Sequence, residues 1–418
     1  MGLMRRYAGF RALWIGQLLS QMGNAIFLIM GLWEIQLRSP FLLAIAGLAM
    51  TIPSSLGVVG GALIDRYDPR RLMLWTDTLR GAAVLLGLLA LAIPHTLIPD
   101  IMALLAVNSL GSALFGPAES VILPWLVKDE DLGAANGLYS VTSQLSSAIG
   151  SAVGGAAIAA IGVAVVFGLD LASFWLSALA IFLMMRVVAR PVSHAHPVSE
   201  LAPLEGLGKS ILEGWRGLGS MPWLVRLIPI ILITNLAFSA AFTMLPYWSR
   251  HILHGDAFIF GILEASWAVG MVVGSVGVSM TSRFSLNSVI AVMGAALGLG
   301  ALAFAISPWP ILSIAILVAT GVANGIANAL LFTLMQRAIP EQIRGRAFGL
   351  LISLITISSP VGSLLSGVFL HVLPLWWSWV LAAVAGFGLS ILAGKWLPRS
   401  QVDFASESVA NDDRPEAF

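Results

Sequence analysis

Twelve apolar stretches of about 20 residues each constrain the fold of this chain more than any other feature of its sequence. A helix of that length crosses a hydrocarbon core about 30 Å thick. Runs such as 85–92 are apolar without alternation, which favours helices over the strands of a membrane barrel. The sequence therefore predicts an all-α integral membrane protein with twelve transmembrane helices. Their approximate ranges are 10–33, 41–64, 72–93, 97–121, 136–160, 164–187, 223–248, 257–280, 286–306, 309–333, 347–371 and 375–397.

Composition excludes several classes of protein. Hydrophobic residues make up 58% of the 418 residues and charged residues 10%, which is too few charges for a soluble globular protein. The 22 Lys and Arg residues balance the 21 Asp and Glu residues, so no nucleic-acid partner is expected. The sequence contains no cysteine and no Walker-type phosphate loop, and its six histidines lie in predicted loops or at span ends. We therefore expect no catalytic site, no metal site and no ATP-driven pump.

Basic residues alternate between the predicted loops. Nineteen of the Lys and Arg residues lie in one set of loops, whereas only Arg38 and Arg250 lie in the other set. Cytoplasmic loops are the ones that are rich in Lys and Arg. The sequence therefore predicts a multi-pass protein of the cytoplasmic (inner) membrane, surrounded by lipid, with both termini in the cytoplasm.

The longest polar stretch divides the predicted spans into two groups of six. We expect an N-terminal six-helix bundle at 1–187, a cytoplasmic central loop at 188–222, a C-terminal six-helix bundle at 223–398 and a disordered cytoplasmic tail at 399–418. The two halves echo each other, because 135–138 resembles 348–350 and 150–155 resembles 359–363. Two related bundles that face each other are a transporter architecture, in which the substrate binds near the midplane.

The most specific local motif is the stretch Gly-Ala-Leu-Ile-Asp-Arg-Tyr-Asp-Pro-Arg-Arg at 61–71. At this stretch the chain resembles the major facilitator superfamily, whose signature between helices two and three is G-x-L-x-D-R followed by basic residues. It departs from that signature at Asp68 and Pro69, where the family usually has a glycine and a basic residue. Four further stretches resemble the drug, macrolide and siderophore exporter branch; they lie at 77–80, 115–118, 169–174 and 340–346.

The resemblance implies pseudo-symmetric bundles that open alternately to the two sides of the membrane. It also implies a cytoplasmic latch between the bundles formed by Gly61, Asp65, Arg66 and Arg70. A basic turn without a latch role is the alternative. In predicted span five, Gly150, Gly154 and Gly155 match glycines of the family's antiporter motif, although Ser151 replaces its proline. This match favours export, and close helix packing is the alternative explanation.

Charged side chains inside a bilayer are costly, and few are present. Asp77 and Arg80 lie three residues apart on a predicted helix and are expected to neutralise each other as a structural pair, with a role in transport as the alternative. Glu264 has no basic neighbour in sequence, so it is the leading candidate for a proton carrier, with Glu34 as the second. The alternatives are that Glu264 binds a cationic substrate or only a hydrogen-bond donor, and that Glu34 is solvated. Asp170 lies near the external end of its span, within the stretch at 169–174 that resembles the exporter branch; it is expected to have a helix-packing role, and solvation is the alternative.

Amide side chains dominate the polar residues of the spans that line the cavity in this superfamily. The candidate cavity residues are Gln17, Gln21, Asn24, Asn108, Asn235, Phe238, Asn324 and Asn328. Amides among aromatic side chains suit a bulky amphipathic molecule, whereas hydrogen bonds between helices are the alternative role for each amide.

These observations together predict a monomeric secondary active transporter rather than an enzyme. It is expected to export small amphipathic organic compounds, such as drugs, macrolides or siderophore-like molecules, in exchange for protons, with the proton gradient as its energy source and no cofactor. A lysophospholipid or another lipid-like substrate is the main alternative, and import of a nutrient is less expected.

Overall fold

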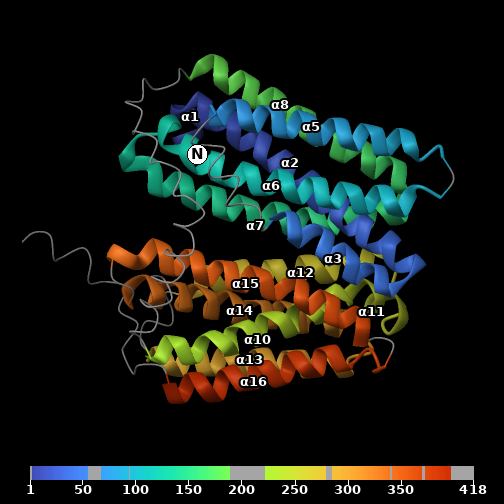
Figure 1. Cartoon of the computed structure of the whole chain (residues 1–418), viewed down its shortest axis with the longest axis vertical. Coiled ribbons are helices and arrows are strands. Elements are labelled where there is room, and N and C mark those ends of the chain that lie inside the picture. Colours follow the sequence, from blue (N-terminus) through green and yellow to red (C-terminus); the bar gives the residue numbers. More distant parts are fainter. Residues whose placement is uncertain are drawn as a thin grey trace, which may run out of the picture.

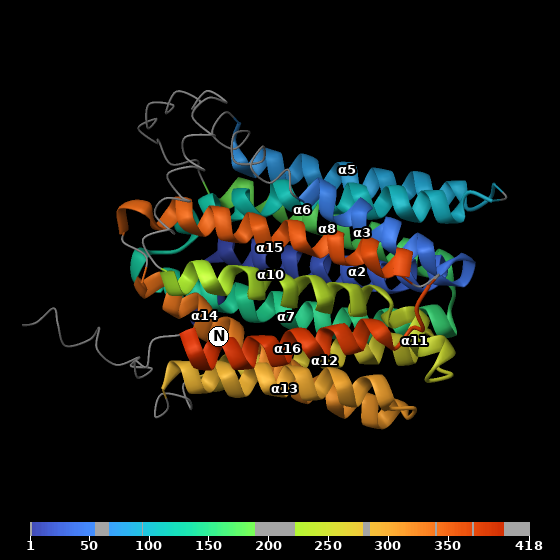
Figure 2. The ribbon, with the colours of Figure 1, turned by 60° about the horizontal axis from the view of Figure 1, so that its bottom comes forward.

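A computed structural model describes residues 2–54, 67–93, 95–188, 222–278, 285–338, 341–369 and 372–396. The helices run nearly parallel to one another, and they form two groups that lie one above the other in Figure 1 and remain parallel in Figure 2. The first group contains α1 (Gly2–Arg6), α2 (Ala8–Arg38), α3 (Pro40–Ser54), α5 (Pro69–Ala90), α6 (Leu97–Leu126), α7 (Asp129–Ala160) and α8 (Val163–Val187). The second contains α10 (Pro222–Thr243), α11 (Leu245–His251), α12 (Ala257–Gly277), α13 (Leu286–Ile306), α14 (Pro310–Ala338), α15 (Glu341–Phe369) and α16 (Trp377–Trp396).

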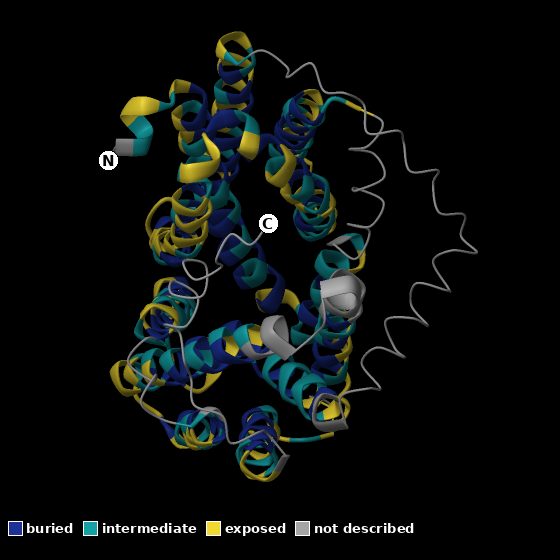
Figure 3. Cartoon of the chain, turned by 90° about the vertical axis from the view of Figure 1, so that its left-hand side faces the viewer, coloured by how far each residue is buried: buried dark blue, intermediate teal, exposed yellow. Residues whose placement is uncertain are grey.

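The helices confirm the predicted all-α fold. In the described part of the chain, nine helices are long and apolar enough to cross a membrane, and α3 and the second half of α15 are shorter apolar helices. α7 is 32 residues long but richer in Ser and Gly. Apolar side chains such as Leu86, Val276 and Val384 are more than half exposed, as lipid-facing side chains should be (Figure 3). The predicted central loop and tail lie outside the described residues, except at 188 and 222.

The predicted seventh span, 223–248, is not one continuous helix. α10 ends at Thr243, Met244 leaves the helical conformation, and α11 begins at Leu245. Pro246 gives the physical reason, because proline has no backbone N–H to donate and its ring clashes with the carbonyl four residues earlier. The expectation of an uninterrupted span was therefore wrong at its end.

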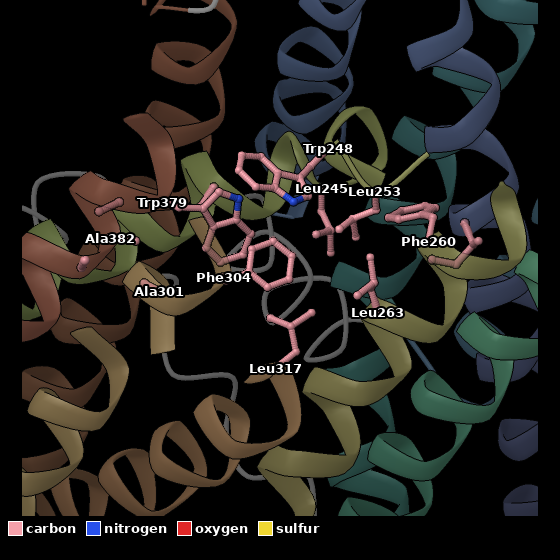
Figure 4. Close-up of a cluster of buried hydrophobic side chains, with 14 of the residues drawn as sticks. Leu245, Trp248, Leu253, Phe260, Leu263, Ala301, Phe304, Leu317, Trp379 and Ala382 are labelled. Carbon is pink, nitrogen blue, oxygen red and sulfur yellow. The ribbon is translucent and has the colours of Figure 1, made fainter. Parts of the chain in front are cut away.

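Aromatic packing fixes the short helix α11 to its neighbours. Trp248 of α11, Phe304 of α13 and Trp379 of α16 are almost completely buried (Figure 4). The ring centroids of Phe304 and Trp379 lie 4.1 Å apart, and those of Trp248 and Phe304 lie 5.7 Å apart. Large buried rings contribute much of the packing energy of a core, so this cluster holds the broken helix in place.

The two ends of the helix groups differ in charge. Described basic residues gather at the end where α2 begins, called here the basic end; they include Arg5, Arg6, Arg70, Arg71, Lys128 and Arg186. Arg38 and Arg250 lie at the other end, called here the opposite end. Figure 3 faces the basic end.

The two helix groups touch backbone to backbone near the opposite end. A Cβ atom added to Gly155 of α7 would lie only 2.4 Å from the carbonyl oxygen of Ala257 in α12. A Cβ added to Gly261 of α12 would lie 2.4 Å from the carbonyl oxygen of Ser151 in α7. Between α3 and α15, Gly47 likewise makes room for Ser363. Small residues therefore close the opposite end, because they let helices from the two groups approach without intervening side chains.

A further polar contact joins α1 and α2 to the start of α7 at the basic end. The Tyr7 hydroxyl donates to Asp131 Oδ2 at 2.8 Å, and Arg6 Nη1 donates to the same atom at 3.0 Å. The Tyr7 hydrogen bond and then the Arg6 guanidinium hold the pKa of Asp131 below its usual value. Asp131 precedes predicted span five and lies outside the membrane-spanning part.

Replacing Gly155 with Ala tests the glycine contact. We expect a loss of about 1–3 kcal/mol, because the added methyl group meets backbone atoms that cannot rotate away. Gly137→Ala on the same helix is the matched control, because its Cβ would meet no atom within 4 Å. Alanine should there stabilise the helix by about 0.5–1 kcal/mol. Thermal unfolding in detergent measures both, and equal effects of the two changes would contradict the role of Gly155.

The Asp131 contact predicts a pH dependence. Because the folded pKa of Asp131 is lowered, its stabilisation is fully present at neutral pH and is lost as the pH falls through a value below about 3.9. Amide hydrogen exchange of residues 2–10 against pH, corrected for intrinsic rates, measures it. Asp131→Asn should abolish this dependence, whereas Asp129→Asn should leave it unchanged, since Asp129 is exposed and forms no ion pair with the described residues of α1.

Candidate functional site

A cavity of about 470 Å³ lies between the two helix groups, mainly against the second. Its lining comes from α2, α3, α10, α12, α13, α14, α15 and α16. The lining residues are Leu32, Leu43, Gly47, Met50, Thr51, Ile231, Thr234, Asn235, Phe238, Ser239, Phe242, Thr243, Glu264, Trp267, Leu297, Asn324, Ala327, Asn328, Leu331, Ile355, Ser359, Ser363 and Leu389. Most of these residues lie near the middles of their helices, so the cavity sits well inside the helical region.

One wall of the cavity is aromatic. The rings of Phe238 and Phe242 on α10 lie 6.0 and 4.7 Å from the Trp267 ring on α12, centroid to centroid. Trp267 follows Glu264 by one helical turn, so the carboxyl group and the indole lie on the same face of α12. The arrangement places an acidic group beside three aromatic rings.

Another wall is built from hydroxyl and amide groups. Ser239 on α10 donates to the Ser359 carbonyl oxygen on α15 at 2.7 Å, and the hydroxyls of Thr243 and Ser363 lie 2.8 Å apart. Ser358 donates to Asn235 Oδ1 at 3.0 Å. These bonds join α10 to α15 and supply polar groups to an otherwise apolar cavity.

Glu264 is the single ionisable side chain among the described residues that line the cavity. It is partly exposed to that cavity and forms no salt bridge with the described residues. A carboxyl group in such a place can exchange a proton with the cavity or attract a cationic group. Because none of the described residues that line the cavity is basic, an anionic ligand is disfavoured at this site.

The predicted cavity residues divide between the two helix groups. Asn235, Phe238, Asn324 and Asn328 line the cavity, whereas Gln17, Gln21, Asn24 and Asn108 are not among its lining residues. Glu34 is not among them either. Gln17 and Asn108 are buried within the first group. Sequence reasoning missed Trp267, although its position one turn after Glu264 was the signal that could have found it.

Charged side chains gather at a second place, inside the first helix group. Arg80 Nη1 lies 3.5 Å from Asp77 Oδ1, so the predicted pair is in contact, and Ser177 donates to Asp77 Oδ2 at 2.6 Å. Asp170 of α8 lies beside this pair and is completely buried. The expectation that Asp170 could be solvated near a span end was therefore wrong, because α8 packs that face against α2 and α5.

Of the predicted latch residues, Gly61, Asp65 and Arg66 lie outside the described residues. Arg70 forms an ion pair with Asp68 at 2.9 Å and donates through Nη1 to the Val188 carbonyl oxygen at 2.9 Å. Asp68 also caps α5 by accepting from the Arg70 backbone N–H, and Pro69 occupies the first helical turn. The departure from the family signature at 68 and 69 thus makes a strong helix start.

Two glycines of the antiporter-like stretch at 150–155 contact different helices. Gly154 packs against the Ile26 backbone on α2, whereas Gly155 packs against α12 of the other helix group. Adjacent glycines thus hold α7 both to its own group and to the second group.

The chain matches, over residues 4–415, the family described as transmembrane secretion effector, which is part of the major facilitator superfamily. It belongs to that family. Its members are membrane transporters and not enzymes. The chain is 27% identical over 407 residues to the enterobactin exporter EntS of Citrobacter koseri, covering 94% of this chain and 92% of the relative. It is 26% identical to EntS of Salmonella typhi with the same coverage.

Solved structures show the same fold. A bacterial homologue of the iron transporter ferroportin in an inward-facing state gives a TM-score of 0.68 at 18% identity, covering 93% of this chain and 98% of that one. The outward-facing state of such a homologue gives 0.58. The peptide transporter POT gives 0.69 at 14% identity, covering 93% of this chain and 94% of that one. The major facilitator fold predicted from the sequence is confirmed.

Arg70→Ala tests the contacts at the start of α5. We expect it to lower stability by about 1–3 kcal/mol, because it removes the ion pair with Asp68 and the hydrogen bond to the Val188 carbonyl oxygen. Arg71→Ala is the matched control, since Arg71 is exposed one position further on. Thermal unfolding in detergent measures the difference, and similar melting temperatures for the two variants would disprove this role of Arg70.

Proposed function

We propose that this protein is a proton-coupled exporter of amphipathic organic compounds that carry aromatic groups, in the class of siderophore-like and drug-like molecules. The observation that carries the proposal is the cavity between the helix groups, where Glu264 stands beside Phe238, Phe242 and Trp267. The enterobactin exporters that resemble the chain over nearly its whole length support export and the class of substrate.

The aromatic wall and the amide groups have separate roles in binding. The rings of Phe242 and Trp267 offer apolar contact and stacking to a planar group of the substrate. Asn235, Asn324 and Asn328 offer donors and acceptors that fix its orientation. With no basic side chain among the described lining residues, the substrate is neutral or cationic when it binds there.

We propose that transport proceeds by alternating access. The close contact of Gly155 with α12 supports a state that is closed at the opposite end. The higher similarity to the inward-facing than to the outward-facing ferroportin homologue agrees with that state. The distribution of basic residues supports placement in the inner membrane with both termini in the cytoplasm. In the outward-open state, Gly61, Asp65, Arg66 and Arg70 would form the cytoplasmic latch.

Glu264 would couple the inward movement of protons to the outward movement of substrate. A proton that enters from outside and binds Glu264 favours release of the substrate, and loss of that proton to the cytoplasm prepares the cavity for the next substrate molecule. Each proton that moves inward supplies about 2.3 kcal/mol per 100 mV of membrane potential. No cofactor and no second subunit are needed for this cycle, and Glu34 stays the second candidate for a proton carrier.

One further observation favours the alternative of a lipid-like substrate. A groove of about 330 Å³ lies on the other face of α10, between α15 and α16. Its lining is almost wholly apolar, and Ile233, Leu381 and Val384 there are exposed. An acyl chain would fit such a groove, so a lysophospholipid belongs in any test of the substrate.

Proteoliposomes with a membrane potential of about 100 mV test the role of Glu264. A panel of siderophores, macrolides and aromatic dyes supplies the substrates. For a neutral compound that the native protein moves, Glu264→Gln should lower the steady-state accumulation ratio by up to about 50-fold, because exchange for one proton moves one net charge and so contributes about 2.3 kcal/mol at this potential. Glu119→Gln, outside the cavity lining, is the matched control, and Glu34→Gln tests the second candidate.

The outcomes separate the alternatives. Accumulation that Glu264→Gln leaves unchanged would remove Glu264 from the coupling mechanism. Movement of a fluorescent lysophospholipid, with none of the panel compounds moved, would instead establish the lipid-like alternative.

A further inference from the structure

Three buried charged residues of the first helix group, Asp77, Arg80 and Asp170, lie together, and their charges do not balance. Asp77 and Arg80 lie on α5 and Asp170 lies on α8, and none of the three lines the cavity that holds Glu264. Both aspartates are completely buried, and Arg80 is 4% exposed. If all three were ionised, two negative charges would face one positive charge in a place that water does not reach.

Asp77 has two polar contacts. Ser177 donates a hydrogen bond to Oδ2, and Arg80 Nη1 lies 3.5 Å from Oδ1, which is an ion-pair distance, although Oδ1 itself accepts no hydrogen bond from the described residues. The other arm of Arg80 is directed to α6, where Nη2 donates to the Asn108 carbonyl oxygen and to the Ser112 hydroxyl. The guanidinium also lies 4.8 Å from the centre of the Phe174 ring. Arg80 is thus fixed between three helices.

Gly111 explains how Arg80 reaches this position. A Cβ added to Gly111 of α6 would lie 2.3 Å from Arg80 Nε. Any larger residue at position 111 would therefore displace the guanidinium group. The close packing of α5 and α6 at this glycine leaves room for the Arg80 side chain.

Asp170 lacks the contacts that Asp77 has. Neither of its carboxylate oxygens accepts a hydrogen bond from the described residues. Arg80 is near enough to attract it electrostatically, and Asn108 faces it without the geometry of a hydrogen bond. On the α2 side it meets Gly23, where an added Cβ would lie 3.2 Å from Asp170 Oδ1.

Among the described residues, no other charged side chain on the helices packed around Asp170 compensates it. Besides Asp77, Arg80 and Asp170, the charged residues of α2, α5, α6, α7 and α8 lie toward the ends of those helices; they are Arg11, Glu34, Arg38, Arg70, Arg71, Asp100, Glu119, Asp129, Glu130, Asp131 and Arg186. Asp100 and Glu119 are 8 and 11 residues along α6 from Asn108, which is at least two helical turns. Arg80 is therefore the local counter-charge for both aspartates.

A buried charge without a partner is strongly unfavourable, and one guanidinium neutralises one carboxylate. We propose that the cluster of Asp77, Arg80 and Asp170 is a proton-binding site, and that the proton resides on Asp170 while Arg80 pairs with Asp77. This site is separate from Glu264 and lies in the other helix group. Its occupancy sets which carboxylate Arg80 neutralises, and so it links proton binding to the packing of α5, α6 and α8.

Infrared spectroscopy of the purified full-length protein tests the site directly. A protonated carboxyl group buried in the protein gives a C=O band apart from that of ionised carboxylates. We expect Asp170 to contribute such a band at neutral pH, seen as a loss of C=O absorption in the difference spectrum between Asp170→Asn and the native protein. Asp77→Asn should remove it as well, because Asp170 must then ionise to neutralise Arg80. Glu264→Gln should keep it, so this test is independent of the proposed role of Glu264.

Thermal unfolding of the same variants gives a second test. Asp170→Asn and Asp77→Asn alone should each leave the melting temperature near that of the native protein, because Arg80 keeps one carboxylate in both. The double variant should lose far more than the sum of the single changes, since Arg80 is then unpaired. Asp77→Asn combined with Asp100→Asn is the matched control and should be additive.

Three results would overturn the proposal. They are unchanged C=O absorption in Asp170→Asn, unchanged C=O absorption in Asp77→Asn, and an additive effect of the Asp77 and Asp170 changes on stability. If Asp170→Asn does not fold, the band in Asp77→Asn decides the question alone.

Discussion

The hydrocarbon core of a membrane supplies no water, and this constraint governs both the fold and the chemistry of the protein. Backbone groups in lipid must find their hydrogen bonds within helices. Charged side chains must find a partner, a proton or a wet cavity. Long apolar helices satisfy the backbone groups. The charged side chains are accommodated in two different ways, at Glu264 in the cavity and at the cluster of Asp77, Arg80 and Asp170.

Backbone contact between the helix groups sets the shape of the molecule. Gly155 and Gly261 remove side chains from the contact of α7 with α12, and Gly47 does so between α3 and α15. These contacts lie near the opposite end, so the cavity is bounded there by packed helices. In a transporter, the contacts between the two helix groups must exclude solvent from one side of the cavity. They must also be few enough for the two groups to separate when that side opens. Contacts through a few glycines meet both needs, because they seal without interlocking large side chains.

The surroundings of Glu264 and of Asp170 differ in their access to the cavity and in their charged neighbours. Glu264 lies in a cavity of the second helix group, without a basic partner among the described lining residues, where a substrate can reach it. Asp170 is sealed inside the first group beside Arg80, where no substrate of the expected size fits. The first arrangement suits exchange between a proton and a substrate. The second suits a proton whose effect is on helix packing, because Arg80 contacts α5, α6 and α8 together.

The linear sequence was sufficient to predict an all-helical membrane protein, because apolar length is a local property of the chain. It also indicated Glu264 and the pair Asp77 and Arg80, since a charge inside an apolar stretch is conspicuous without any knowledge of packing. It could not show that Asp170 joins that pair, because the contact spans 90 residues or more and depends on how α8 packs on α5. Nor could it divide the amides between the cavity and the interior of the first group, because the direction in which a side chain points within a bundle is decided by the neighbouring helices. The helix break at Met244 depends on both local sequence and tertiary structure. Pro246 indicates in the sequence that the helix is interrupted, whereas the aromatic packing around Trp248 determines where the helix resumes.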